Sequence, residues 1–451
     1  MTRLPSSPVY DVESIVFVTL LIGFGLAGMI ALLQRTRPGF AVGTPVVVGV
    51  IARMIAAAGV SVSGLGLSLR GGDEIGFVRG AREVAASGFD SRLWFPSDLH
   101  RLHEIVFALQ IKLGDFSDGA LRVTQIGIAM LGIVLVLAAI YDLAGPRAAR
   151  VGAWVLVLEP ANIFFNSILH REPLLVLASG LVVFGGARIW AKLELRGVCV
   201  LGLGCALALG TRPYAAWFLM TAGLLLLLHA SLRQMGTKLR SLPLVYAVAI
   251  VVAAATPAVL SLTSQDSLEQ NLQGSQDANT DPNARRGEVS SNNLSLERVD
   301  FSTRSDLFTN LPRRIRDVVL RPYPWQVQNT SQRLGAIGTL VVLYALYLLA
   351  RYTRRNRGRV IALTAPILYP GIFLLMAYAL SVGNAGTGFR YRTHLVLLGL
   401  ATLIVLREHS LRRASVPSIE PLAEGSDPPS DRPAGRAGYF APPANHGSQR
   451  V

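Results

Sequence analysis

The sequence has few charged residues and almost no cysteine for a chain of 451 residues. Only 16% of the residues are charged, whereas 51% are hydrophobic. A soluble domain cannot bury that much apolar surface while it keeps its exterior polar. The two cysteines, Cys199 and Cys205, lie in one apolar segment, where we expect them to pack rather than to pair or bind metal. These shortages exclude a soluble globular protein.

Acidic residues are also outnumbered, by 43 lysines and arginines to 28 aspartates and glutamates. A formal charge of +15 would suit a nucleic-acid-binding protein. The basic residues, however, form short clusters between apolar runs and do not follow one polar face. That distribution is typical of the cytoplasmic loops of membrane proteins. We therefore expect the partner to be a lipid bilayer and not a nucleic acid.

Long apolar runs predict an all-α polytopic membrane protein, because roughly 20 residues of helix cross a bilayer. About eleven transmembrane helices are expected. Their approximate ranges are 14–33, 41–63, 120–143, 151–166, 173–190, 197–211, 213–230, 242–262, 332–350, 360–382 and 393–407. The short runs at 151–166 and 197–211 would need flanking residues to complete a crossing.

The basic residues also predict an orientation. They follow every second predicted span, as Arg35 and Arg37 follow the first and Arg351 to Arg359 follow the ninth. Cytoplasmic loops are enriched in lysine and arginine. The N-terminus is therefore expected outside and the C-terminus in the cytoplasm.

This topology divides the chain into six segments. We expect N-terminal transmembrane helices, an external loop with an acidic motif and an interfacial helix, a transmembrane bundle, a large external loop, C-terminal transmembrane helices and a disordered cytoplasmic tail. In that order, their ranges are 1–63, 64–119, 120–262, 263–331, 332–407 and 408–451. The apolar stretch 104–111 is too short to span and is the expected interfacial helix.

Polar residues close to the apolar runs form four clusters, all on the expected external side. Charged groups near a membrane are costly, so each cluster is a functional candidate. In the first, Gly71-Gly72-Asp73-Glu74, the acids are either solvated in a turn or supply a general base. In the second, His170-Arg171-Glu172, the charges either cap the next helix or bind a phosphate through Arg171.

The third cluster is Thr211-Arg212-Pro213-Tyr214, where the arginine either extends to lipid headgroups or belongs to the same site. The fourth runs from Gly386 to His394 and contains Arg390, Tyr391 and Arg392. Arginines here oppose the positive-inside trend, which favours either headgroup anchoring or a phosphate clamp.

Three further residues stand apart from these clusters. His103 belongs to a His100-x-x-His103-Glu104 pattern that is weak evidence for a metal site, so no metal ligand is predicted. Arg53 and Glu159 lie inside predicted spans without a nameable partner.

The order of the four clusters resembles multispanning glycosyltransferases of the C superfold, such as the protein O-mannosyltransferases and the bacterial lipid A aminoarabinose transferases. The resemblance covers roughly residues 64–406. The matching segments are Gly72-Asp73-Glu74, Ser167 with Arg171-Glu172-Pro173-Leu174, Arg212-Pro213 and Arg390-Tyr391. An added N-terminal span and the lack of a soluble C-terminal domain depart from the family and indicate a divergent member.

The resemblance implies an enzyme of a bacterial inner or plasma membrane whose active site faces outside. It would transfer a hexosyl or pentosyl group from a polyprenyl-phosphate donor to a lipid, glycan or protein acceptor, with inversion. Asp73 would be the base and Glu74 the reserve candidate. The residues implied to bind the donor and its phosphate are His170, Arg171, Glu172, Arg212, Arg390, Tyr391, Arg392 and His394. Some family members need a divalent metal, but no acidic pair here clearly supplies its ligands, so no cofactor is assigned.

Other function classes stay open at this point. A polysaccharide polymerase or ligase would act on polyprenyl-diphosphate-linked glycans with a similar set of arginines. A lipid or solute transporter would need polar groups at mid-membrane, and only Arg53 and Glu159 qualify. A non-catalytic assembly factor would keep the fold without the chemistry.

Overall fold

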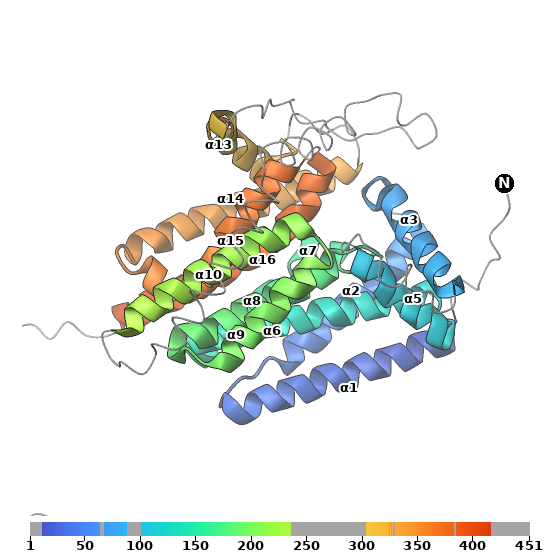
Figure 1. Ribbon diagram of the computed structural model, residues 1–451, viewed down its shortest axis with the longest axis horizontal. Coiled ribbons are helices and arrows are strands. Elements are labelled where there is room, and N and C mark those ends of the chain that lie inside the picture. The colour runs from blue at the N-terminus through green and yellow to red at the C-terminus, as the bar shows by residue number, and fades with distance from the viewer. Residues whose placement is uncertain are drawn as a thin grey trace, which may run out of the picture. The chain divides into compact units, whose positions relative to one another are not determined.

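The computed structural model describes residues 11–63, 67–87, 101–235, 304–323, 325, 327, 330–382 and 385–415 (Figure 1). No strand occurs in these ranges, and eight of their helices are long and apolar enough to cross a membrane. The chain thus has the all-α architecture of a polytopic membrane protein, as predicted. The predicted span 242–262 and most of the predicted loop 263–331 and tail 408–451 lie outside the described residues. The count of eleven spans stays a prediction.

The first two helices are α1 (Val12–Thr36) and α2 (Gly43–Ser63). Asp11 caps α1, because its carboxylate accepts the backbone N–H groups of Glu13 and Ser14. Both helices pack on α6. Large apolar side chains of α1, such as Phe24, remain exposed. Such a surface suits contact with lipid.

The helices α3 (Leu67–Ala86) and α5 (Leu102–Gly114) are not candidate spans. They pack on each other through a small core that includes Val78 and Phe107 (Figure 1). The predicted interfacial stretch 104–111 falls within α5. The motif Gly71 to Glu74 lies inside α3, so the expectation of a turn at this point is wrong.

The helix α6 (Asp118–Val157) reverses its direction at Gly145, whose φ of 83° and ψ of −177° precede Pro146. A Cβ on Gly152 would lie 3.3 Å from side-chain atoms of Leu137 and Ile140. The leg after Gly145 therefore folds back along the leg before it. This second leg and the short helix α7 (Pro160–Phe165) cover the predicted span 151–166, with a break at Leu158 and Glu159.

Next follow α8 (Glu172–Lys192), α9 (Leu195–Leu209) and α10 (Pro213–Met235). Helix α8 packs on α6, α9, α10 and α15. Gly132 of α6 and Gly180 of α8 make the closest approach, since a Cβ on Gly180 would meet the backbone of Gly132. Side-chain-free positions on both helices let their backbones touch. Helix α9 is shorter than the other apolar helices, as its predicted range 197–211 suggested.

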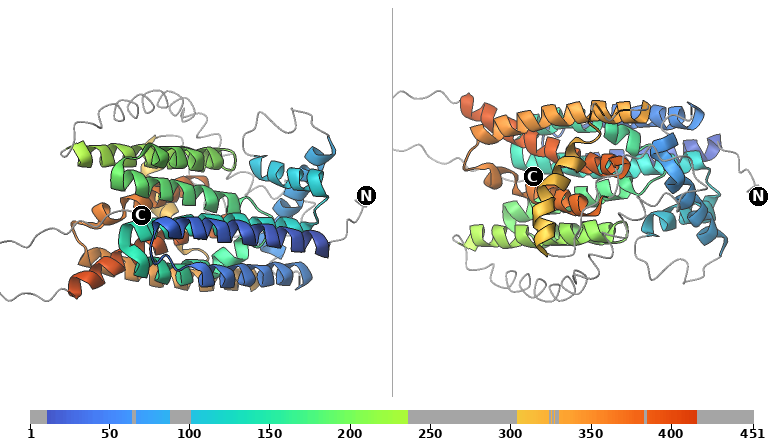
Figure 2. Two further views of the ribbon diagram at one scale, coloured as in Figure 1. Left: turned by 90° about the horizontal axis from the view of Figure 1, so that it is seen from below. Right: turned by 90° about the horizontal axis from the view of Figure 1, so that it is seen from above.

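The last helices are α13 (Arg304–Leu320), α14 (Thr330–Arg355), α15 (Val360–Ser381) and α16 (Ala385–Ala414). Figure 2 shows α13 crossing the long helices, and it packs on α15 and α14. One face of α13 buries Val318 while Arg313 is exposed. After it, the rings of Tyr323 and Trp325 stack at 4.9 Å and Trp325 stays exposed.

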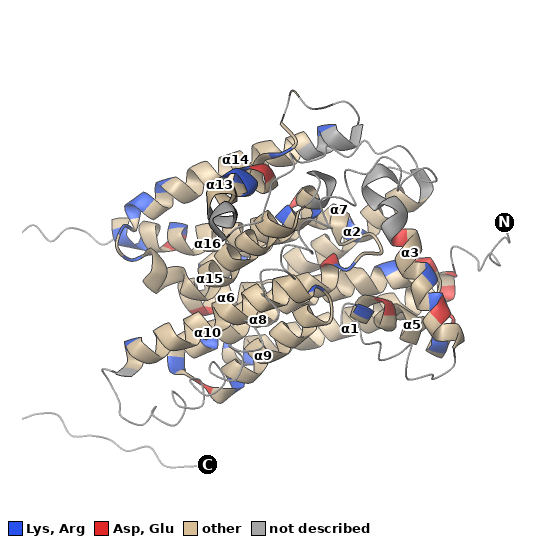
Figure 3. Cartoon of the chain, turned by 45° about the horizontal axis from the view of Figure 1, so that its top comes forward, with Lys and Arg blue, Asp and Glu red and all other residues tan. Residues whose placement is uncertain are grey.

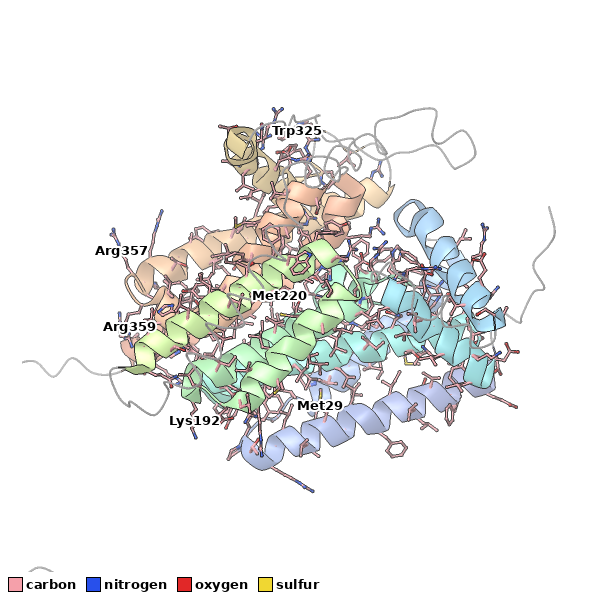
Figure 4. All side chains as sticks on the ribbon, viewed as in Figure 1. Met29, Lys192, Met220, Trp325, Arg357 and Arg359 are labelled. Atoms are coloured by element: carbon pink, nitrogen blue, oxygen red, sulfur yellow. The ribbon has the colours of Figure 1, made fainter. Side chains whose placement is uncertain are left out.

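One end of the bundle collects the basic connections, and we call it the basic end. Contacts tie its parts together: Arg37 pairs with Asp142, the Trp190 ring N–H donates to the Ala362 carbonyl, and His409 bonds the Leu143 carbonyl. Figure 3 shows lysines and arginines gathered there, and Figure 4 labels Lys192, Arg357 and Arg359 at this end. Helices α3 and α5 lie at the opposite end (Figure 3).

Candidate functional site

The centre of the candidate site is Glu172, the first residue of α8, whose side chain is 0% exposed. Its Oε1 accepts a hydrogen bond from Nη2 of Arg212 at 2.5 Å. Arg212 stands directly before α10, and its guanidinium lies 4.2 Å from the centre of the Tyr391 ring. It also donates to the hydroxyl of Tyr214 at 2.9 Å. The predicted second, third and fourth clusters therefore meet around one buried ion pair.

Helix α16 joins this centre through two positions one turn apart. Arg390 donates to Nδ1 of His170 at 3.1 Å, and His394 lies 3.3 Å from the Glu172 carbonyl oxygen. An arginine only donates, so Nδ1 of His170 accepts and its ring is neutral. The contact of His394 with the Glu172 carbonyl is made by Nε2, and its Nδ1 lies 3.1 Å from the hydroxyl of Tyr378. Both histidines are fully buried.

The first predicted cluster reaches the same place through Glu74 of α3. Its carboxylate pairs with Arg122 of α6 at 2.5 Å and accepts the backbone N–H of Leu169 at 3.2 Å. Three residues later, the Phe77 ring lies 5.0 Å under the guanidinium of Arg171. Glu74 is thus held in a buried ion pair that fixes α3 beside residues 169–171. The side chain of Asp73 lies outside the described residues.

Arg392 does not join Arg390. Its guanidinium donates to the Val319 and Arg321 carbonyls and to the Thr339 hydroxyl, at 2.9 to 3.2 Å. Residues two apart on a helix point to different faces. The structure therefore places Arg392 between α13 and α14, and the expectation that both arginines lie together is not met.

His103 joins the site, although the sequence reasoning did not select it. It is 1% exposed, and its ring meets Phe77 edge-on at a centroid distance of 4.3 Å. The backbone N–H of Leu102 donates to the Gly210 carbonyl at 3.0 Å, which ties α5 to the turn before Arg212. Burial, together with the positive charge of Arg171, holds the pKa of His103 well below its usual range. Two sequence signals pointed to this position, the short apolar stretch 104–111 and the pattern His100-x-x-His103-Glu104, but neither predicted a place in the site.

Arginines from four parts of the chain meet in the cluster. Arg122 and Arg212 each pair with a glutamate, Arg171 lies over the Phe77 ring, and Arg390 donates to His170. Burial lowers the pKa of Arg171, but a guanidinium starts so high that it stays protonated. Several guanidinium groups close together suit an anion with several oxygens.

Metal ligands are a separate question. The described ranges contain no group of three or more His, Cys, Asp or Glu side chains that could hold a metal ion. Glu74 and Glu172, the carboxylates described within the cluster, already face arginines. We therefore derive no step that needs a metal.

The two unexplained residues of the spans, Arg53 and Glu159, belong to the break between α6 and α7. Arg53 donates to the carbonyls of Gly49 and Val157, the latter at the last residue of α6. Glu159 accepts the N–H groups of Ala161 and Asn162 and so caps α7. Positive charge at a helix C-terminus and negative charge at an N-terminus are both favourable. Their role at the break is therefore structural.

No family model, curated protein or solved structure matches this chain. The functional argument therefore depends on the geometry of the site.

Proposed function

We propose that this protein is a membrane glycosyltransferase that moves a sugar from a polyprenyl-phosphate donor to an acceptor on the external side. One observation carries the proposal: motifs from α3, α8, α10 and α16 meet around the buried pair of Glu172 and Arg212. These are the motifs whose order along the chain resembles the C-superfold transferases. A shared position in space is what a single active site requires.

The phosphate of the donor would bind to Arg171 and Arg390. Both belong to the group of arginines at Glu172, and Arg390 also donates to His170. A planar guanidinium matches two phosphate oxygens at once. Because Glu172 holds Arg212 and Glu74 holds Arg122, these two pairs serve to position α10 and α3. Phosphate binding by Arg392 is not part of this proposal.

A lipid-linked donor fits the surroundings of α16. An apolar cavity of about 180 Å³ lies between α14, α15 and α16. Its lining includes Arg392, Leu395 and Val396, on the face of α16 that turns away from Arg390. A prenyl tail that lies in this cavity, among residues such as Leu349 and Ile367, would pass around α16 from a phosphate at Arg390.

The orientation rests on the basic end. Loops rich in arginine stay in the cytoplasm. The ionic cluster, which consists of Glu74, Arg122, Arg171, Glu172, Arg212 and Arg390, contacts α3 and α5. Figure 3 shows these two helices at the end of the bundle opposite the basic end. Sugar nucleotides are scarce outside the cytoplasm, so an external transferase needs a donor that the membrane carries. The membrane would be the bacterial inner or plasma membrane.

The reaction is a direct displacement. An acceptor hydroxyl attacks the anomeric carbon, the bond from that carbon to the phosphate oxygen breaks, and polyprenyl phosphate leaves. A carboxylate accepts the hydroxyl proton, and Asp73 is the residue we assign to this step. Arginines that face the leaving phosphate stabilise its growing charge, an effect worth several kcal/mol when water is excluded. The configuration at the anomeric carbon inverts.

The test is release of polyprenyl phosphate from a panel of lipid-linked sugars by the purified protein in nanodiscs. We expect turnover by the unmodified protein and a loss of at least about 100-fold in Asp73→Asn and in Arg390→Ala. Arg357→Ala removes an exposed arginine that Figure 4 labels at the basic end, and it should leave turnover unchanged. Release from diphosphate-linked glycans alone would overturn the proposal in favour of a polymerase or ligase.

A second control reports the side of the membrane. Arg79 is exposed on α3, five residues after Glu74. With Cys199 replaced by alanine, Arg79→Cys should keep turnover and react with a membrane-impermeant thiol reagent added to intact cells. Labelling only after the cells are opened would place the site in the cytoplasm and remove the argument for a lipid-linked donor.

A further inference from the structure

Within the described part of the chain, His103 is a buried polar side chain without a hydrogen bond. Neither of its ring nitrogens has a hydrogen-bond partner among the described residues, although the side chain is 1% exposed. Buried polar atoms are nearly always paired, with protein or with something bound. An imidazole left without partners loses the hydrogen bonds that water would give it and gains none in return. Oε1 of Glu104 lies 3.8 Å from Nε2 of His103, which is beyond hydrogen-bond distance. Both ring nitrogens therefore stay available to a polar group of a ligand.

The same place holds other buried atoms of this kind. Oε2 of Glu172 and Nε of Arg212 also lack a hydrogen-bond partner within the described part of the chain. His103 shares the Phe77 ring with Arg171, at 4.3 Å and 5.0 Å from the ring centre. These atoms come from α5, α8 and the turn before α10. Their convergence indicates one binding position beside the phosphate-binding arginines.

The chemistry of His103 limits what it can bind. Burial and the nearby arginines lower its pKa far enough that the ring is neutral at physiological pH. A neutral imidazole offers one N–H donor and one nitrogen acceptor and no charge to attract a phosphate. A hydroxyl group has the matching acceptor and donor. Neighbouring Arg171 and Arg390 would hold the anion, and His103 would hold an alcohol next to it.

We propose that His103 binds a hydroxyl group of the sugar that the donor carries on its phosphate. This inference rests on the proposed function and makes it narrower: the ligand has an anionic part at the arginines and a hydroxylated part at α5. His103 would be a specificity-determining residue: it would make the protein bind the sugar-carrying lipid more tightly than polyprenyl phosphate, the product that remains after transfer.

The test compares two lipids on purified protein in nanodiscs: polyprenyl phosphate and the same lipid with a hexose. The unmodified protein should bind the hexose lipid more tightly. His103→Phe keeps a flat ring but removes both polar atoms, and we expect it to weaken hexose-lipid binding about 5- to 10-fold, as for one lost hydrogen bond. Binding of the bare lipid should not change. His103→Gln, which keeps a donor and an acceptor, should recover most of the loss.

His229→Phe is the matched control, because His229 is a histidine near the basic end that already bonds Tyr369. His229→Phe should leave unchanged the difference in affinity between the hexose lipid and the bare lipid. Equal loss of both lipids in His103→Phe and His103→Gln would assign His103 a merely structural role and overturn the inference. If His103→Phe and His103→Gln both keep the affinity difference between the two lipids, the inference is also overturned. The proposed function would not be affected by that result. Failure of the unmodified protein to bind either lipid would overturn both.

Discussion

At the scale of single residues, Glu172 is the residue on which the site depends. It is fully buried, it begins α8, and it faces Arg212 at 2.5 Å. Two charges removed from water are stable only when they remain paired. Loss of either one leaves the other uncompensated, and the turns that carry His170 and Tyr214 lose their fixed relation.

We expect Glu172→Gln and Arg212→Met each to destabilise the protein by about 3–5 kcal/mol, the usual effect of breaking a buried pair. The double variant should lose clearly less than the sum, because no charge is then left unpaired. Thermal and denaturant unfolding in detergent measure this. Strictly additive losses would show that the two side chains do not interact as their distance indicates.

Part of the site could be predicted from such residues. Arg171, Arg212 and Arg390 stand out in the sequence because each lies where a charge is expensive. The pairing of charges was beyond prediction, since it depends on which helices are neighbours. Arg122 lies in a predicted span and carried no signal, yet it binds Glu74.

At the scale of elements, helix direction decides which residues meet. The sequence predicted the last span from residue 393, whereas α16 begins at Ala385. Arg390 and His394 therefore lie on one face, toward Glu172, and Arg392 faces α13. Glycines at 386 and 388 favoured a loop at the sequence level, and tertiary packing overrides that preference. Helix α13 was missed for a similar reason, because arginines and Pro312 obscure its apolar face.

The reversal at Gly145 also belongs to this scale. A φ of 83° with a ψ of −177° is open to glycine alone. We predict that Gly145→Ala destabilises the protein by about 1–3 kcal/mol, the strain of a residue forced into such a conformation. Gly202→Ala is the control, since an added methyl group in the middle of α9 meets no atom within 4 Å. It should be neutral or slightly stabilising.

Melting temperatures of the two glycine variants, purified in the same detergent, decide the point. A Gly145→Ala protein as stable as Gly202→Ala would mean that α6 continues past residue 145, and Gly152 would then not lie against Ile140. The chain would then have to reach residues 166–171 from the basic end by a route other than the second leg of α6 and α7.

At the scale of the whole molecule, the two ends of the bundle differ in kind. Figure 3 shows the basic connections at one end and α3 and α5 at the other. The buried pairs of Glu74 with Arg122 and of Glu172 with Arg212 belong to the end with α3 and α5. The long apolar helices and this asymmetry could be predicted from hydropathy and from the arginine clusters. The break between α6 and α7 was not predicted, because Glu159 and Pro160 were counted inside one span although both mark the start of α7.

The central claim is that the ionic cluster binds the phosphate of a lipid-linked sugar. The most direct test is a cryo-EM structure of the protein in nanodiscs with a polyprenyl-phosphate hexose bound to the Asp73→Asn variant. The account predicts the phosphate within hydrogen-bond distance of Arg171 and Arg390, with the sugar toward His103. A phosphate bound elsewhere, with Arg171 and Arg390 left as they are, would contradict it.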